Sequence, residues 1–181
     1  MLYNPDMKKL SVVSLFTSLI ILISPLVAFA ASPVLPNVDT LTFNNESQYF
    51  GTKCTWPKWS GELYVGKSTS YNCTFKDKSV SMLVMGYSST ESGNGHGQAY
   101  FIRTIAKSKS GYESLTYAAV IVGIFNQVQK EIETWIKSNV LQIKNGMKLT
   151  KSFGSKKSKA SIKITIIGGP GQMRTVEISS N

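Results

Sequence analysis

The side chain best suited to proton transfer near neutral pH is the single histidine, His96, which stands in a glycine-rich run at residues 93–97. A histidine that acts as a general base is oriented by a carboxylate and faces a nucleophile, and a metal site needs several converging ligands. Glu91 is the nearest acid in the sequence, and there is no second histidine. The sequence therefore favours a non-catalytic protein without metal or cofactor, and it leaves His96 as the one catalytic candidate.

Residues 61–68 match the G-x-x-x-x-G-K-[ST] pattern of nucleotide-binding loops. Such a loop needs a flexible turn with a helix directly behind it, so that backbone amides and the helix N-terminus hold the phosphates. The four residues between the two glycines are Glu-Leu-Tyr-Val, and those after Lys67 are rich in Ser, Thr and aromatics, as strands are. The match therefore predicts a strand and not a nucleotide site.

Two tryptophans, Trp56 and Trp59, flank a proline and a lysine in what should be a connection between strands. Exposed tryptophan rings can stack on sugars or lie in a lipid interface, and loops commonly carry binding residues. The alternative is that both rings cover one end of the core, because tryptophan is highly buried on average. Both residues are binding candidates.

Lysines dominate the last third of the chain. From Thr134 onward there are nine basic residues and one acid, Glu177. A basic segment of this kind attracts acidic lipid headgroups, polyanionic glycans or nucleic acid, although the same lysines can form an ordinary solvated face. Nucleic acid is the disfavoured partner, because no aromatics are interleaved with the lysines. The predicted binding lysines are Lys144, Lys148, Lys151, Lys156, Lys157 and Lys159.

The first thirty residues have the pattern of a signal peptide. Lys8 and Lys9 precede an uncharged run over residues 10–30, which ends in Ala-Phe-Ala. We expect cleavage before Ala31 and a periplasmic or secreted protein whose membrane contact is at most peripheral; the alternative is a retained anchor. Cleavage would leave 18 basic and 9 acidic residues of the 20 and 10 in the full sequence, a net charge of +9.

The only two cysteines are Cys54 and Cys73. They do not form a Cys-x-x-Cys motif, and no histidine lies near them in the sequence, so nothing favours redox or nucleophilic chemistry. Export would bring them into an oxidising compartment, where paired thiols become disulfides. We therefore expect one structural disulfide.

Alternating and β-branched residues predict strands, after a proline-containing linker at residues 31–39. The polar segments 76–79 and 88–97 have the length of hairpin loops, so the strands should form an antiparallel meander. The predicted strands before the helix span residues 40–43, 49–55, 63–75, 80–87 and 99–106.

One long helix is expected over residues 110–139. Ser110 and Glu113 have the spacing of a capping box, and Glu133 can pair with Lys137 one turn later. Residues 115–125 are apolar nearly all round and should be more deeply buried than the second half. After a lysine-rich connector, two final strands are expected at 161–167 and 174–179. The fold class is α+β, an antiparallel sheet packed on one long helix in a single domain at residues 40–181.

Three functional hypotheses follow. The first is an exported, non-catalytic binding module that meets an anionic lipid or glycan surface through the lysine-rich half and the Trp56–Trp59 loop. The second is a small-ligand or lipid carrier with a cavity between helix and sheet. The third is a secreted hydrolase or toxin that uses His96. The sequence leaves the oligomeric state open.

Overall fold

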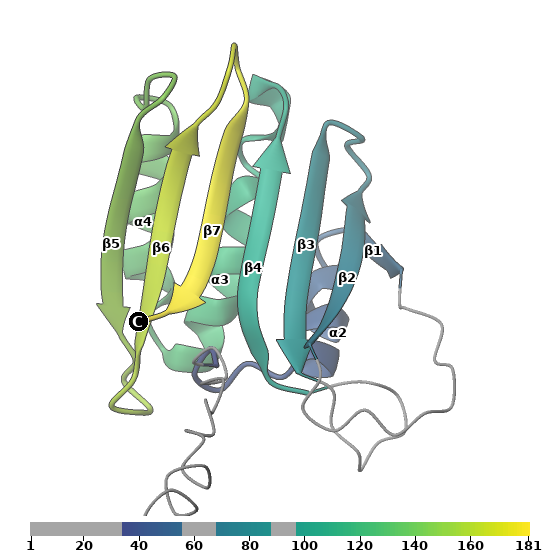
Figure 1. Ribbon diagram of the computed structural model, residues 1–181, viewed down its shortest axis with the longest axis vertical. Helices are drawn as coiled ribbons and strands as arrows, with labels where there is room; N and C mark the ends of the chain where they lie inside the picture. The colour runs from purple at the N-terminus through teal and green to yellow at the C-terminus, as the bar shows by residue number, and fades with distance from the viewer. Residues whose placement is uncertain (1–33, 56–67, 88–96) are drawn as a thin grey trace, which may run out of the picture. The chain divides into compact units, whose positions relative to one another are not determined.

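The computed structural model describes residues 34–55, 68–87 and 97–181, which belong to one compact unit, Ser32–Asn181. The predictions for the signal peptide, Trp56, Trp59 and His96 lie outside these residues. So does most of the 61–68 match. Figure 1 draws the described elements in colour.

The described residues form a seven-stranded antiparallel sheet in the order β1-β2-β3-β4-β7-β6-β5. The first four strands are a meander, the last three are a second meander that ends in the β6–β7 hairpin, and β4 pairs with β7 to join them (Figure 1). The predicted α+β class, meander and C-terminal hairpin are confirmed. The strands are β1 (Thr52–Thr55), β2 (Ser68–Phe75), β3 (Val80–Tyr87), β4 (Ala99–Ala106), β5 (Lys148–Gly154), β6 (Ser161–Gly168) and β7 (Arg174–Ser180).

The helices lie behind one face of the sheet (Figure 1). They are α2 (Thr40–Gln48), α3 (Leu115–Asn126) and α4 (Gln129–Val140), with the short 3₁₀ turn η2 (Lys109–Gly111) before α3. Strand alternation decides which side chains meet them. In β6, for example, Ile162, Ile164 and Ile166 are fully buried on the helix side, whereas Lys163 is exposed on the open side.

The predicted strand at residues 40–43 is wrong, because these residues begin helix α2. The carboxylate of Asp39 accepts hydrogen bonds from the amides of Leu41 (2.9 Å) and Thr42 (3.1 Å), which satisfies amides that have no partner inside the helix. Phe43 then packs fully buried in the core. The alternating Thr-Leu-Thr-Phe pattern favours a strand, but the aspartate cap and the burial of one helix face outweigh that local preference.

The predicted long helix is two helices. Gln127 adopts a left-handed conformation with φ of 59° and ends α3, and the amide of Val128 donates to the carbonyl of Gly123 over 2.9 Å. The first half is more deeply buried than the second, as predicted. The expected pair of Glu133 and Lys137 is also present, at 2.6 Å.

The predicted capping box is wrong. Ser110 lies in η2, five residues before α3 begins at Leu115, and its hydroxyl lies 2.8 Å from that of Ser108. The extra turn arises where Gly111 packs closely: a β-carbon at this position would lie 2.4 Å from the side chain of Val80. The contact with β3 therefore sets the start of α3 more strongly than the local capping pattern.

The lysine-rich connector contains a strand, β5, that the sequence pattern does not predict. Leu149 and Phe153 pair with Ile166 and Ile162 of β6 and face the helix side. The residues between them are polar because β5 is an edge strand, and edge strands commonly carry lysines that discourage further pairing. A strand with so few apolar residues resembles a loop in the sequence.

The segment expected to be a linker contributes to the core. Leu35 and Val38 are fully buried. The amide of Leu35 donates to the carbonyl of Ala99 (2.7 Å), and the amide of Ala99 donates to the carbonyl of Val38 (2.9 Å). Residues 35–38 are therefore attached to the start of β4.

Candidate functional site

The cysteines form the predicted disulfide, Cys54–Cys73, with an S–S distance of 2.07 Å. They stand directly opposite each other in the β1–β2 register, and Cys73 is buried in the core on the helix side. Because both thiols are consumed, the bridge ties an edge strand to the sheet and offers no nucleophile.

The lysines that come together do so beside α4, in two adjoining depressions that we call the α4–β5 groove. The larger, about 480 Å³, is lined by Lys130, Glu131, Thr134, Trp135, Ser138 and Lys151. The smaller, about 300 Å³, shares Lys130 and Glu131 and adds Lys156 and residues 127–129. The groove therefore combines cations, hydroxyls and one indole ring.

Aromatic packing holds the wall of the α4–β5 groove. Trp135 is half-buried and meets Phe153 of β5 edge to face, with ring centroids 5.9 Å apart. The ammonium of Lys151 lies 5.1 Å from the centroid of the same Phe153 ring. Lys151 and Phe153 lie two residues apart on β5 and so point to the same face. Contacts with Phe153 thus position both the Trp135 ring and the Lys151 ammonium.

The groove carries more positive than negative charge. Lys130, Lys151 and Lys156 line it, and Glu131 is the one acid among the lining residues. The Lys156 ammonium lies 3.2 Å from the Glu131 carboxylate, but both side chains are more than half exposed, at 59% and 54%. An exposed pair of this kind is largely screened by water and contributes little stability. An incoming anion can therefore recruit Lys156.

One turn further along α4, Lys137 is engaged with Glu133 at 2.6 Å. The hydrogen bond from Lys137 to this carboxylate, together with its negative charge, raises the pKa of Lys137 above its usual value. Lys137 therefore stays protonated and neutralises Glu133, so that this acid does not oppose an anion bound in the groove.

A hydrogen-bonded turn fixes the position of Lys156. The hydroxyl of Ser155 accepts from the amides of Lys157 (3.1 Å) and Ser158 (3.2 Å), which stiffens the β5–β6 connection. The amide of Lys156 donates to the carbonyl of Asn126 at the end of α3 (3.1 Å). The turn is thus attached beside the break between α3 and α4.

The predicted binding lysines do not all gather in one place. Lys151 and Lys156 line the groove, and Lys157 and Lys159 follow on the same turn. Lys148 is exposed at the start of β5, three residues and roughly 10 Å from Lys151, and it lies on the opposite face of the strand. Lys144 precedes it in the connection from α4. The predicted lysines are therefore spread along one edge of the sheet and over both of its faces.

The sequence analysis does not predict the groove residues of α4, which are Lys130, Glu131, Thr134, Trp135 and Ser138. Lys130, Thr134 and Ser138 recur every four residues, which places them on one helix face. That spacing was available in the sequence. The sequence does not show which strand lies beside this face, because the pattern of β5 does not predict a strand.

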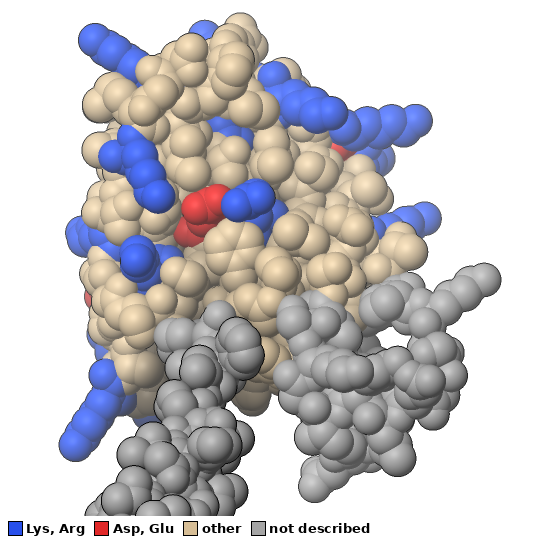
Figure 2. Space-filling model, in the orientation of Figure 1, with Lys and Arg blue, Asp and Glu red and all other residues tan. Residues whose placement is uncertain are grey.

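The open face of the sheet has a different character. Figure 2 shows it largely uncharged, with one acidic–basic contact in the middle and most basic side chains around the rim. Arg103 of β4 and Glu177 of β7 are neighbours in register, and their charged atoms lie 2.7 Å apart. This arginine is therefore already paired with a carboxylate.

A hollow between α2 and the sheet bears on the carrier hypothesis. It is lined by Phe43, Tyr71 and Val84, among others, and holds about 10 Å³. That volume holds about one water molecule, so a lipid chain does not fit there. Beside α3 and α4, large side chains such as Ile102, Leu115 and Ile132 are fully buried.

Among the described residues, no group of three or more His, Cys, Asp and Glu side chains could hold a metal ion. Within the same ranges, no helix combines the length and apolar character needed to cross a membrane. Comparison with protein-family models, curated proteins and solved structures finds no match.

Proposed function

We propose that this protein is an exported, non-catalytic binding module that holds an anionic glycan in the α4–β5 groove. The observation that carries the proposal is that Lys130 and Lys151 line one depression together with the half-buried Trp135, and that Lys156 lines the adjoining depression, which shares Lys130. Three cations from a helix, a strand and a turn thus line one continuous groove. Net positive charge on a fixed surface attracts a polyanion and orients its approach.

The neighbouring hydroxyls favour a glycan over a lipid surface. Thr134 and Ser138 line the groove next to Trp135. The Ser138 hydroxyl donates to the Thr134 carbonyl (2.8 Å) and can accept from a sugar hydroxyl, whereas the Thr134 hydroxyl can donate or accept. The indole is held against Phe153 and forms part of the wall. A flat sugar face can lie on such a ring, whereas a membrane anchor would extend its apolar side chains beyond the surface.

The proposed destination is the periplasm or the extracellular space. The signal-like first thirty residues motivate it, and the Cys54–Cys73 disulfide supports it, because disulfides persist in oxidising compartments. Both compartments expose proteins to anionic glycans of cell envelopes.

The test is titration of the protein with heparin, as an anionic glycan, and with neutral dextran, across a salt series. Heparin should bind, dextran should not, and heparin affinity should fall as salt rises. Lys130→Glu/Lys151→Glu should weaken heparin binding by about tenfold or more, because charge repulsion replaces attraction at the groove. Lys107→Glu/Lys109→Glu is the matched control: it makes the same change in net charge at exposed lysines outside the groove lining.

Equal loss in both double variants would refute the groove and leave only a response to net charge. If heparin affinity does not change with salt concentration, the proposal that lysine charges drive the binding is refuted. The protein could instead bind phosphatidylglycerol vesicles and not heparin, and lose this binding in Lys130→Glu/Lys151→Glu. That result would identify a lipid headgroup, and not a glycan, as the ligand of the groove.

A further inference from the structure

Glu131 is the one acid among the residues that line the α4–β5 groove, and it lines both depressions. Its side chain therefore stands where the two depressions meet. A carboxylate repels an anionic ligand, so a surface that only had to attract negative charge would bind more tightly without it. The junction of the groove thus combines attraction by lysines with repulsion by one acid.

The Glu131 carboxylate keeps room for a ligand. The Lys156 ammonium lies 3.2 Å from it, and this lysine belongs to the turn attached to the end of α3. An ionised carboxylate has about four acceptor positions on its two oxygens, and one ammonium does not occupy all of them. The Glu131 side chain is 54% exposed. It can therefore accept further hydrogen bonds from a molecule in the groove.

Glu131 also lies in the first turn of α4. A carboxylate at this position stabilises a helix through the partial positive charge of the helix N-terminus. A residue with this role alone would affect the stability of the protein and not the choice of ligand. Stability and ligand selectivity therefore separate the two roles.

Two kinds of polyanion would meet the Glu131 carboxylate differently. A sugar hydroxyl next to an anionic group can donate a hydrogen bond to it, while the anion meets Lys130 or Lys156. Inorganic polyphosphate is ionised at neutral pH and offers charged acceptors in place of hydroxyl donors, so it meets Glu131 as a like charge. Repulsion of the wrong partner in this way is a common source of specificity.

The rest of the groove suits a ligand longer than one sugar. Lys130 and Lys156 line the smaller depression, whereas the larger adds Lys151, the indole of Trp135 and the Ser138 hydroxyl. Lys130 and Ser138 lie about 12 Å apart along α4, at 1.5 Å per residue, which exceeds the length of a single sugar ring. A ligand that fills both depressions therefore spans more than one sugar unit and crosses the junction at Glu131.

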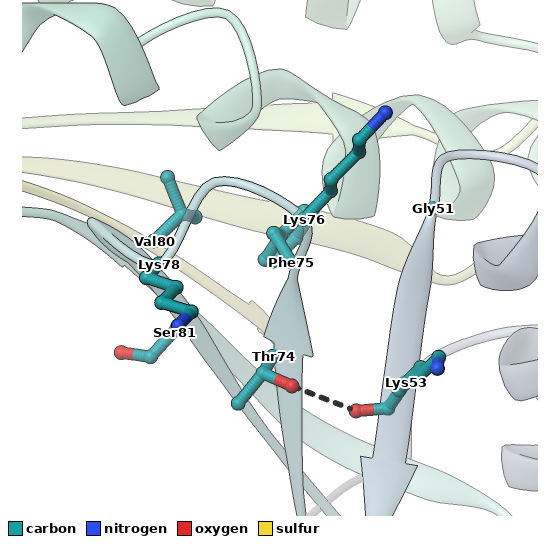
Figure 3. A pocket seen from close by; sticks show the side chains of 8 residues that line it. All are labelled: Gly51, Lys53, Thr74, Phe75, Lys76, Lys78, Val80 and Ser81. Carbon is teal, nitrogen blue, oxygen red and sulfur yellow. Dashed lines mark hydrogen bonds between the residues drawn. The ribbon is translucent and has the colours of Figure 1, made fainter.

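A hollow of about 700 Å³ beside β1, β2 and β3, at the other edge of the sheet, provides a comparison (Figure 3). Lys53, Lys76 and Lys78 line it, with no carboxylate among the lining residues. Figure 3 shows these lysines extending apart from one another. Dispersed lysines of this kind attract any polyanion and do not distinguish between them. Selection among anions therefore needs the groove, where a carboxylate stands among the cations.

Resting on the glycan function proposed above, we infer that Glu131 makes the α4–β5 groove selective for acidic glycans whose charged groups are separated by free hydroxyls. Glu131 accepts from a sugar hydroxyl at the junction, and Lys130 and Lys156 hold the neighbouring anionic group. Polyanions without hydrogen-bond donors are disfavoured by the same carboxylate.

The experiment is calorimetric titration of the protein with hyaluronan oligosaccharides, in which carboxylates alternate with uncharged sugars, and with inorganic polyphosphate. Glu131→Gln should strengthen polyphosphate binding by about fivefold or more, because a like charge is removed. Hyaluronan affinity should stay within about twofold, because the amide oxygen still accepts from a hydroxyl, although more weakly than a carboxylate.

Glu133→Gln is the matched control. It removes the same charge from α4 at a residue that is already paired with Lys137 at 2.6 Å and lies outside the groove lining. Both affinities should change together, by at most about twofold. Glu131→Ala, which removes the acceptor altogether, should weaken hyaluronan binding by about fivefold and still strengthen polyphosphate binding.

Thermal unfolding of each variant establishes that it is folded before titration. If both Glu131 variants change the two affinities by the same factor, or lower only the melting temperature, Glu131 has no part in selection and the glycan function stands without it. If neither heparin nor hyaluronan binds the unmodified protein, the proposed function is refuted and the selectivity of Glu131 with it.

Discussion

The side-chain amide of Asn37 donates a 2.9 Å hydrogen bond to Oδ1 of Asn126, which lies 89 residues further along the chain. The Nδ2 of Asn126 donates in turn to the carbonyl of Pro36 (2.8 Å) and to that of Val122 (2.9 Å). Asn126 is fully buried, so its amide satisfies these groups where water does not reach. This residue attaches the segment before α2 to the end of α3.

Asn126→Ala should therefore lower the free energy of unfolding by about 2–3 kcal/mol, because buried carbonyls lose their donor. The measurement is urea denaturation. Asn139→Ala is the matched control, since half-buried Asn139 makes a local bond to the carbonyl of Trp135 (2.7 Å) and should cost about 1 kcal/mol or less. Equal losses would show that Asn126 has no special role in joining the two segments.

Gln127 stands at the break between α3 and α4 in the left-handed conformation, with φ of 59°. A non-glycine residue there costs roughly 1 kcal/mol, and glycine adopts it freely. Gln127→Gly should therefore raise the free energy of unfolding by up to about 1 kcal/mol. Part of this gain is offset, because glycine has more conformational entropy than glutamine in the unfolded chain. Gln127→Ala, which keeps the β-carbon, should give no such gain. A destabilised Gln127→Gly protein would contradict this account of the break.

Acid should weaken the β2–β3 turn through Asp77. The amide of Ser79 donates to this carboxylate and lowers the pKa of Asp77 below its ordinary value of 3.8. The folded state therefore binds this proton less tightly than the unfolded state. The resulting stability is complete above about pH 4 and is lost as the pH falls through the folded pKa.

Asp77→Asn should accordingly flatten the decline of the melting temperature below about pH 4. Ser110→Ala removes only a minor contribution to the lowered pKa and should keep most of that decline. Melting temperatures measured from neutral pH down to about pH 2 decide the matter. Parallel profiles for Asp77→Asn and the unmodified protein would rule out the proposed linkage.

The disulfide should matter mainly for stability. Cys54 and Cys73 are 19 residues apart, and closing a loop of that length stabilises a fold by about 3 kcal/mol in the chain-entropy model. Cys54→Ser/Cys73→Ser should lose that amount in urea denaturation, and a reductant should destabilise only the unmodified protein. Unchanged stability in the double variant would mean that the β1–β2 pairing alone closes this part of the sheet.

Several features could be predicted from the sequence because their causes are local. The strands β3, β4, β6 and β7 carry apolar or β-branched side chains at alternating positions, and short polar turns separate neighbours in a meander. The spacing of Ile132 and Ile136 marks the buried face of α4 in the same way. The disulfide could be predicted because the chain has only two cysteines and its first thirty residues indicate export to an oxidising compartment.

Other features depend on contacts between distant segments. The Thr-Leu-Thr-Phe segment of α2 has a strand-like local pattern, and only its Asp39 cap and the burial of Phe43 make it helical. The lysines of β5 suggest a loop, because an edge strand needs few apolar residues. In both cases tertiary packing outweighs local propensity.

The candidate sites likewise combine features that the local sequence determines with features that depend on contacts between distant segments. The sequence by itself determined which residues carry the positive charge, because net charge and lysine positions need no fold. The tertiary structure alone decided which of them meet: it brought Lys130 and Trp135 of α4 to Lys151 of β5, and it placed Lys148 on the opposite face of that strand. The physical reason is that strand pairing and helix packing, which join segments remote in sequence, set the distances between side chains.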